Sequence, residues 1–215
     1  ALVFNPQLVL MDEPLGALDK QLREHMQIEL KELHRQLGVT FVYVTHDQGE
    51  ALTMSDRVAV FNEGVIQQLA DVESLYETPS NRFVAGFVGD STVLSGTLQG
   101  AGANAAIQMP GGFLLPGVNV NQAPVGARVQ ACVRPERVVL LPQSEYPRPN
   151  AIPATVARTI YYGDHLRLIC ELGHGQEQAT VKRALSPSGA GASHPQPGDQ
   201  VLLEFPPSAT RIYAV

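Results

Sequence analysis

Two carboxylates and a histidine are the residues of this sequence whose types and spacing best suit a chemical step. Asp12 and Glu13 end one apolar run, and His46 ends a second apolar run about one helix later. In a parallel α/β sheet, ligands bind at the carboxyl ends of the strands, so these side chains are expected to share one edge. Asp12 suits holding Mg²⁺ through water, because this ion dehydrates reluctantly. Glu13 suits the role of general base, and His46 suits a contact with a terminal phosphate. The pattern predicts the back half of an ATP hydrolysis site.

The segments that must position these residues follow the order strand, helix, strand. Residues 8–11 are apolar without alternation, which predicts a strand buried on both faces. Residues 20–37 carry apolar side chains at helical spacing, with Asp19 placed as the N-cap and Gly38 placed to end the helix. Residues 39–45, rich in β-branched and aromatic types, predict a second strand parallel to the first.

The remaining pattern changes character near residue 90. Before it, the sequence predicts short helices over 48–54, 72–76 and 80–88, and a hairpin of 57–61 with 65–69. After it, strand-like runs alternate with Gly, Pro and Asn, over 92–99, 105–109, 112–115, 127–133, 137–141, 152–162, 165–172, 177–183 and 200–214. Regular short strands predict a small barrel or sandwich, with a low-complexity loop over 186–197. The predicted fold class is α/β over residues 1–90, followed by an all-β domain over 91–215.

Composition limits the classes of protein that fit. The chain has 215 residues and a formal charge of −6, which argues against electrostatic binding of nucleic acid over its surface. It has no apolar run of about 18 residues, so no membrane span is predicted. Cys132 and Cys170 lie far apart in strand-like runs, which favours two buried thiols over a disulfide. The chain enters a core strand without an initiator methionine, so we expect that it is truncated upstream.

Three motifs in order give the sequence a family resemblance. Residues 8–14 resemble the Walker B motif of ABC transporter ATPases, residues 15–19 resemble their D-loop, and residues 43–48 resemble their switch-histidine segment. The resemblance implies the C-terminal part of a P-loop NTPase domain. It also implies that Asp12 binds Mg²⁺ through water, that Glu13 is the catalytic base, and that His46 contacts the γ-phosphate of ATP. Asp19 would lie at a dimer interface and link two ATP sites.

Structural alternatives stand beside each of these roles. Glu13 could be an ordinary exposed acid, Asp19 could serve only as the helix N-cap, and His46 could be a helix cap. Asp47 and Gln48 are interpreted as helix caps. The other histidines are interpreted as solvated or structural groups: His25, His34, His165, His174 and His194. The family's phosphate-binding loop, Gly-x-x-x-x-Gly-Lys-Ser/Thr, and its Leu-Ser-Gly-Gly-Gln signature do not occur in the sequence. In the family both lie upstream of the Walker B motif.

The β region also resembles a known domain, the transport-associated OB-type domain of importer ATPases. The resemblance is carried by residues 133–136 (VRPE), 161–164 (YYGD) and 198–201 (GDQV). Arg134 and Glu136 are interpreted as a structural turn-and-ion-pair element, with direct ligand binding by the domain left open.

Together, the two resemblances imply the ATP-hydrolysing subunit of a bacterial importer, most similar to the spermidine/putrescine group. The complete subunit would be a homodimer at the cytoplasmic face of the inner membrane. It would bind ATP and Mg²⁺, act on membrane-spanning permease subunits, and depend on a periplasmic solute-binding protein. Sugar, iron and sulfate importers share these motifs. The alternatives are a non-catalytic regulatory or scaffold module, which the missing phosphate loop favours, and a non-transport ABC ATPase, which the β domain disfavours. The chain alone is expected to be inactive.

Overall fold

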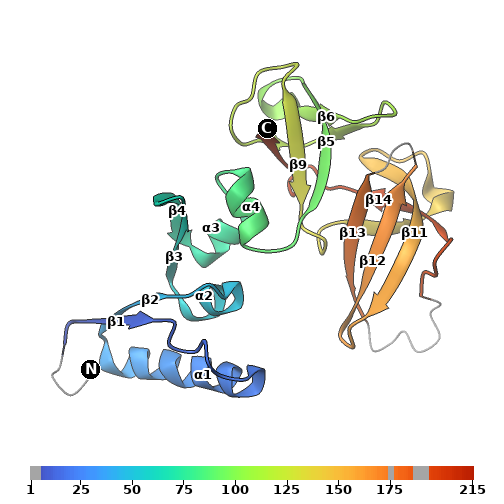
Figure 1. Cartoon of the computed structure of the whole chain (residues 1–215). Helices are drawn as coiled ribbons and strands as arrows, with labels where there is room; N and C mark the ends of the chain where they lie inside the picture. Colours follow the sequence, from blue (N-terminus) through green and yellow to red (C-terminus); the bar gives the residue numbers. More distant parts are fainter. Residues whose placement is uncertain (1–5, 174–176, 186–193) are drawn as a thin grey trace. The chain divides into compact units, whose positions relative to one another are not determined.

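Two compact units make up the chain in the computed structural model, which describes residues 6–173, 177–185 and 194–215 (Figure 1). The first unit runs to Thr78 and the second begins at Pro79. Sequence analysis predicts the domain boundary after residue 90. The contacts instead group residues 79–90 with the β region. Most of the predicted low-complexity loop, residues 186–193, lies outside the described residues.

A parallel strand pair joined by a long helix begins the first unit, as the periodicity predicts. The elements are β1 (Leu8–Asp12), α1 (Lys20–Leu37) and β2 (Thr40–Val44). The strands pair in parallel register, with Asp12 opposite Val44. The Asp19 side chain accepts a hydrogen bond from the Leu22 N–H at 3.0 Å, and Gly38 adopts φ 62° at the C-terminus of α1. Both caps confirm the predicted helix ends, because Asp19 accepts a backbone N–H of the first turn and Gly38 adopts the left-handed conformation without steric cost.

The expectation that β1 is buried on both faces is wrong. Alternate side chains of the pair turn toward α1, and the ring of Phe41 lies 5.2 Å from that of His34 on the helix. The opposite face is exposed: Leu10 has 71% of its surface accessible and Val44 has 61%. The physical reason is that α1 covers one face only, and among the described residues no element packs on the other.

A short helix, a hairpin and another short helix complete the first unit. They are α2 (Gln48–Met54), β3 (Arg57–Asn62), β4 (Val65–Asp71) and α3 (Val72–Glu77). The turn between β3 and β4 has positive φ at Glu63 and Gly64, the left-handed geometry that lets two strands reverse tightly. This matches the predicted hairpin.

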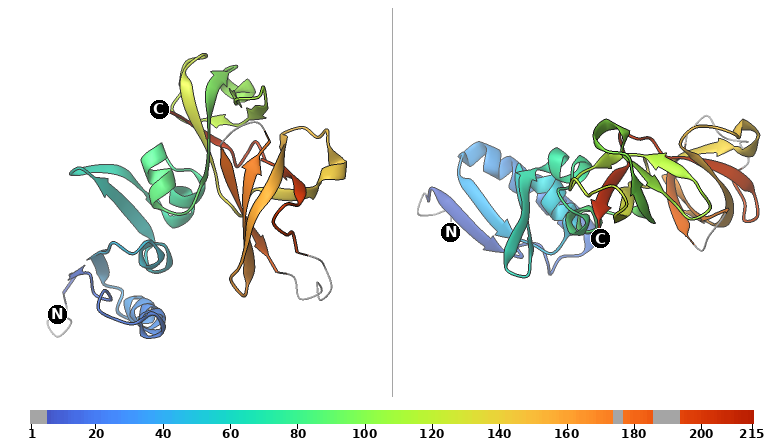
Figure 2. Two further views of the ribbon diagram at one scale, coloured as in Figure 1. Left: turned by 45° about the vertical axis from the view of Figure 1, so that its right-hand side comes forward. Right: turned by 90° about the horizontal axis from the view of Figure 1, so that it is seen from above.

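Two antiparallel-rich sheets form the second unit, after the helix α4 (Arg82–Phe87). The first sheet contains β5 (Thr92–Gln99), β6 (Ala106–Gln108), β7 (Leu114–Pro116), β8 (Val118–Asn119), β9 (Arg128–Val133) and β15 (Arg211–Ala214). The second contains β10 (Val139–Pro142), β11 (Ala151–Tyr161), β12 (His165–Leu172), β13 (Gln178–Ala184) and β14 (Gln200–Glu204). Figure 2 shows the green β5 of the first sheet beside the yellow β9, and the orange β11 and β12 in the other sheet.

One apolar core is shared by the two sheets. Leu98 and Ile107 of the first sheet and Leu168 and Leu203 of the second belong to the same buried cluster. Thr92 on β5 also donates to the Thr180 carbonyl of β13 at 2.9 Å. The predicted buried thiols are observed: Cys132 and Cys170 are free and buried, and burial raises the pKa of the Cys170 thiol to about 11.

The single strand predicted over 200–214 is wrong, because the structure divides it between the two sheets. β14 pairs with β10 and β11, whereas β15 pairs with β9 and β8. Pro206 and Pro207 separate the two strands, and the Thr210 N–H bonds the Pro206 carbonyl at 3.1 Å. Proline cannot donate to a sheet ladder, so the chain turns there and crosses to the other sheet.

Arg134 explains why residues 79–90 group with the β unit. Its side chain is buried, and Nη1 donates to the carbonyls of Ala85 at 2.7 Å and Gly89 at 2.8 Å. The Tyr213 hydroxyl donates to the Pro79 carbonyl at 3.0 Å. The structural role expected of Arg134 is therefore carried out on the end of α4. In the part of the chain that the structure describes, no helix is both long and apolar enough to span a membrane.

Candidate functional site

The two predicted carboxylates differ in their position and backbone geometry at the end of β1. Asp12 is the last residue of the strand and is exposed. Glu13 follows it, with its N–H donating to the Val44 carbonyl at 2.9 Å and with φ at 44°. A positive φ in a residue other than glycine is uncommon and carries a conformational cost, and such positions cluster at functional sites. This turn redirects the Glu13 side chain toward the end of the neighbouring strand.

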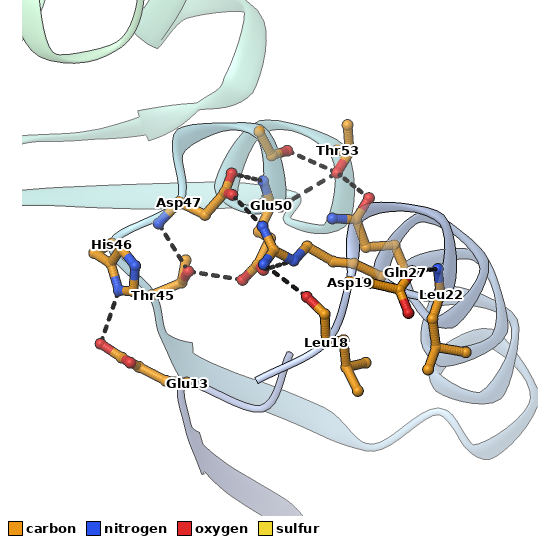
Figure 3. A network of polar contacts seen from close by, with 12 residues as sticks. Glu13, Leu18, Asp19, Leu22, Gln27, Thr45, His46, Asp47, Glu50 and Thr53 are labelled. Carbon is orange, nitrogen blue, oxygen red and sulfur yellow. Dashed lines mark hydrogen bonds and ion pairs between the residues drawn. The ribbon is translucent and has the colours of Figure 1, made fainter. Parts of the chain in front are cut away.

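Glu13 and His46 meet across the ends of the two parallel strands (Figure 3). The Oε1 atom of Glu13 lies 2.9 Å from Nδ1 of His46. Both side chains remain accessible, Glu13 at 51% and His46 at 77%. The structure thus brings together the two residues that sequence analysis expects to be catalytic, at an open edge where a ligand can reach them.

The contact with Glu13 raises the pKa of His46 above its ordinary value. The hydrogen bond is the largest cause, followed by the Glu13 charge, with smaller contributions of the same sign from Asp47 and Glu50. A protonated ring donates from both nitrogens. With Nδ1 bound to Glu13, the Nε2 atom is then a cationic donor suited to an anionic oxygen such as a phosphate.

We predict that Glu13→Gln lowers the pKa of His46 toward the ordinary histidine value. Because the folded pKa lies above the unfolded one, the pair's contribution to stability is present below the unfolded pKa and is lost as pH rises through the folded pKa. The measurement is a titration of the His46 ring protons by NMR in this chain. Glu29→Gln on the exposed side of α1 is the matched control and should leave the titration unchanged. An equal pKa in both variants contradicts the contact.

Asp12 is the residue that fits a magnesium ion. A carboxylate at a strand end offers the hard oxygen that Mg²⁺ prefers, and its exposure leaves room for the waters that the ion keeps. Among the described residues, no group of three or more His, Cys, Asp or Glu side chains is arranged to hold a metal. Contact of Asp12 with Mg²⁺ through water stays a prediction.

Asp19 is engaged at the start of α1 and does not join the Glu13–His46 contact. Its side chain is exposed and caps the helix. The cap alternative is thus observed, and the interface role implied by resemblance stays a prediction. Asp47, expected to be a cap, accepts from the Glu50 N–H at 3.1 Å as the N-cap of α2. The cap alternative for His46 fails, because its neighbour holds that position.

A polar network involving both neighbours of His46 in sequence is not predicted by sequence analysis. It joins Arg23 on α1 to Asp47 and Glu50, with Thr45 bonded to the buried Glu50 carboxylate at 2.7 Å (Figure 3). Charged residues alternate along α1 as they do on a solvated face, so the sequence does not mark Arg23 as different from its neighbours. Only the folded arrangement shows that this arginine points toward the segment after β2.

Three comparisons with known proteins found sequences and a structure that this chain is similar to. Residues 131–212 match the family model of the TOBE domain. The spermidine/putrescine import ATP-binding protein PotA of Rubrobacter xylanophilus is 48% identical over 178 residues, covering 81% of this chain and 46% of that protein. PotA of Roseobacter denitrificans is 40% identical over 215 residues, covering 100% of this chain and 58% of that protein. A solved structure of the cytoplasmic molybdate-binding protein ModG covers 57% of this chain at 20% identity and a TM-score of 0.48.

The chain spans about half the length of the curated relatives it matches. It is related over its whole length to import ATP-binding proteins. Its second unit, an OB-like β fold, carries a TOBE domain.

Proposed function

We propose that this chain, a relative of the spermidine/putrescine import ATP-binding proteins, is part of the ATP-hydrolysing subunit of an ABC importer. The observation that carries the proposal is the 2.9 Å contact of Glu13 with His46 at the ends of two parallel strands. A module without catalysis has no physical need for a carboxylate in left-handed geometry bonded to an exposed histidine. The relatives' printed names, which describe import ATP-binding proteins, support the use of ATP.

In this proposal each residue has a role set by its position. Glu13 accepts a proton from the water that attacks the terminal phosphate, since a carboxylate at an open strand end can act as a general base. The bond to Glu13 favours the protonated form of His46, and in that form the ring donates from Nε2 to the γ-phosphate. Asp12 holds Mg²⁺ through water. When bound, that ion neutralises charge that develops on the phosphate oxygens.

The partners and the location follow from the importer proposal. The complete subunit forms a homodimer, with Asp19 at the interface between its two ATP sites, and it acts on membrane-spanning permeases at the cytoplasmic face of the inner membrane. A periplasmic binding protein delivers the solute. Polyamine is the solute favoured by the relatives' names, with sugar, iron or sulfate as alternatives. The exposed apolar face of β1 and β2 is the surface that the rest of the ATPase domain would cover.

The isolated chain is predicted to show no measurable hydrolysis of ATP. The sequence has no phosphate-binding loop, and this loop normally supplies both the phosphate cradle and a magnesium ligand. The measurement is release of inorganic phosphate from Mg²⁺–ATP by purified chain, with the Glu13→Gln chain as the background control. Turnover that depends on Mg²⁺ and disappears in the control would contradict this prediction.

The test of the function itself is the DNA sequence upstream of the codon for Ala1. If the reading frame continues and encodes a phosphate-binding loop followed by Leu-Ser-Gly-Gly-Gln, the importer proposal is supported. A stop codon followed by a start codon next to Ala1 would contradict it. The second candidate, a non-catalytic regulatory or scaffold module using the TOBE domain, would then take its place, and the absent loop favours it.

A further inference from the structure

Arg23 contacts both segments that flank the Glu13–His46 pair. Its Nη2 atom donates to the carbonyl of Leu18, in the loop that follows Glu13, at 3.0 Å. Its Nη1 atom donates to Oδ2 of Asp47, next to His46, at 3.0 Å. The two arms of one guanidinium therefore join the loop after β1 to the loop after β2.

Glu50 connects Arg23 to Thr45, the residue before His46. Its side chain is only 2% exposed, and Oε1 lies 3.6 Å from Nε of Arg23. The other oxygen, Oε2, accepts from the Thr45 hydroxyl at 2.7 Å, and that hydroxyl accepts the Asp47 N–H at 3.0 Å. Both residues adjacent to His46 are thus held by one hydrogen-bonded network (Figure 3).

The chemistry of this network requires an arginine. A buried carboxylate such as Glu50 is costly unless a cation and further hydrogen bonds compensate it. A planar guanidinium can donate in three directions at once, whereas a lysine ammonium is a point charge on a flexible stem. Arg23 uses two of these directions for hydrogen bonds, to the Leu18 carbonyl and to Asp47. It forms an ion pair with Glu50 at 3.6 Å, and its Nε donates no hydrogen bond to any described residue.

We propose that Arg23 is a positioning residue that holds the Glu13 loop and the His46 loop in the geometry of their mutual contact. It touches neither of the two side chains itself, so it acts through Leu18, Asp47 and Thr45. Its consequence for hydrolysis rests on the proposed function, whereas its effect on the geometry does not.

The readout is the pKa of His46, because this value depends on the distance to Glu13. The charged groups around His46 are Glu13 after β1, Asp47 at the N-cap of α2, Glu50 on α2, and Arg23 on α1 paired with the last two carboxylates. Removing the charge of Arg23 would raise the pKa by leaving two carboxylates uncompensated. Loss of the contact between Glu13 and His46 would lower the pKa of His46. A variant that keeps every charge therefore isolates the positioning effect.

The experiment uses Arg23→Lys and Thr45→Val in this chain, both of which leave the net charge unchanged. We expect the His46 titration followed by NMR to shift downward in each, toward the ordinary histidine value, because the contact with Glu13 loosens. Arg35→Lys, an exposed position on the same helix, is the matched control and should not shift it. Helical content and dispersed amide signals from the first unit identify any variant that has unfolded. If Arg23→Lys unfolds the first unit, the Thr45→Val variant provides the test.

An unchanged or raised pKa in folded variants overturns the proposal. The test contains no ATP, so its outcome is independent of catalysis. A downward shift combined with normal hydrolysis by a full-length Glu13→Gln subunit would support the positioning role while refuting the proposed function. In a full-length subunit that does hydrolyse ATP, Arg23→Lys should lower kcat and leave KM for ATP unchanged.

Discussion

Replacing Glu13 with glutamine in the full-length subunit should abolish ATP hydrolysis while ATP binding persists. A positioned general base contributes about 10²–10⁴-fold to rate, and the amide cannot accept the proton of the attacking water. The substitution is close to isosteric and lies at an exposed strand end, so it should not disturb the fold. Its second effect is on His46, whose protonation it disfavours by removing the neighbouring charge. Both effects act on the chemical step, so kcat should fall far more than nucleotide affinity.

The measurement is steady-state phosphate release together with equilibrium binding of a fluorescent ATP analogue. Glu29→Gln is the matched control, because it removes one carboxylate from an exposed position on α1 and should keep normal turnover. A Glu13→Gln subunit with normal kcat would show that Glu13 is not the base. Loss of binding in parallel with turnover would instead indicate a role in holding the nucleotide.

Replacing Arg134 with methionine should destabilise the second unit by about 3 kcal/mol or more, because several backbone carbonyls lose a hydrogen-bond donor together. The guanidinium is buried and bonds the carbonyls of Ala85, Gly89 and Asp90. Methionine can fill the volume but cannot donate. Each carbonyl left unsatisfied costs about 1–3 kcal/mol, so the end of α4 should lose its attachment to the β unit.

Hydrogen exchange measures this prediction without requiring the whole chain to unfold in one step. The amides of Ala85 and Val88, which bond to Asn81 and Val84 in α4, should exchange faster in the variant. Arg128→Met is the control, because Arg128 lies in the neighbouring strand β9 but is exposed, and its loss should cost under about 0.5 kcal/mol. Equal exchange rates in the two variants would mean that Arg134 does not anchor α4.

Local patterns of the sequence predicted the elements well wherever a short-range rule decides the structure. The ends of α1 follow from the capping of its first turn by Asp19 and from the left-handed geometry of Gly38. The β3–β4 hairpin follows from the turn around Gly64. The proximity of Glu13 and His46 follows from parallel strand order, because parallel strands end at the same edge of a sheet. Their direct contact also depends on the positive φ of Glu13. These features depend on neighbours in sequence or on a general rule of topology.

Other features could not be read from the sequence because they depend on what lies opposite in space. The exposure of Leu10 depends on which face α1 covers, and an apolar run without alternation carries no information about that. The separation of β14 from β15 depends on a crossing between two sheets after Pro206. Composition alone does not show that the residues before Thr92 attach to the β unit.

The candidate chemistry of this protein is already present in its residue order, with two carboxylates at one strand end, a histidine at the next, and a β domain to follow. The charged residues that support that site are identified by the fold. Arg23 resembles every other charged position on its helix until folding places it between Leu18 and Asp47. The physical reason is burial. A carboxylate such as Glu50 acquires its need for a cation only when the fold removes it from water, and no local pattern encodes that event.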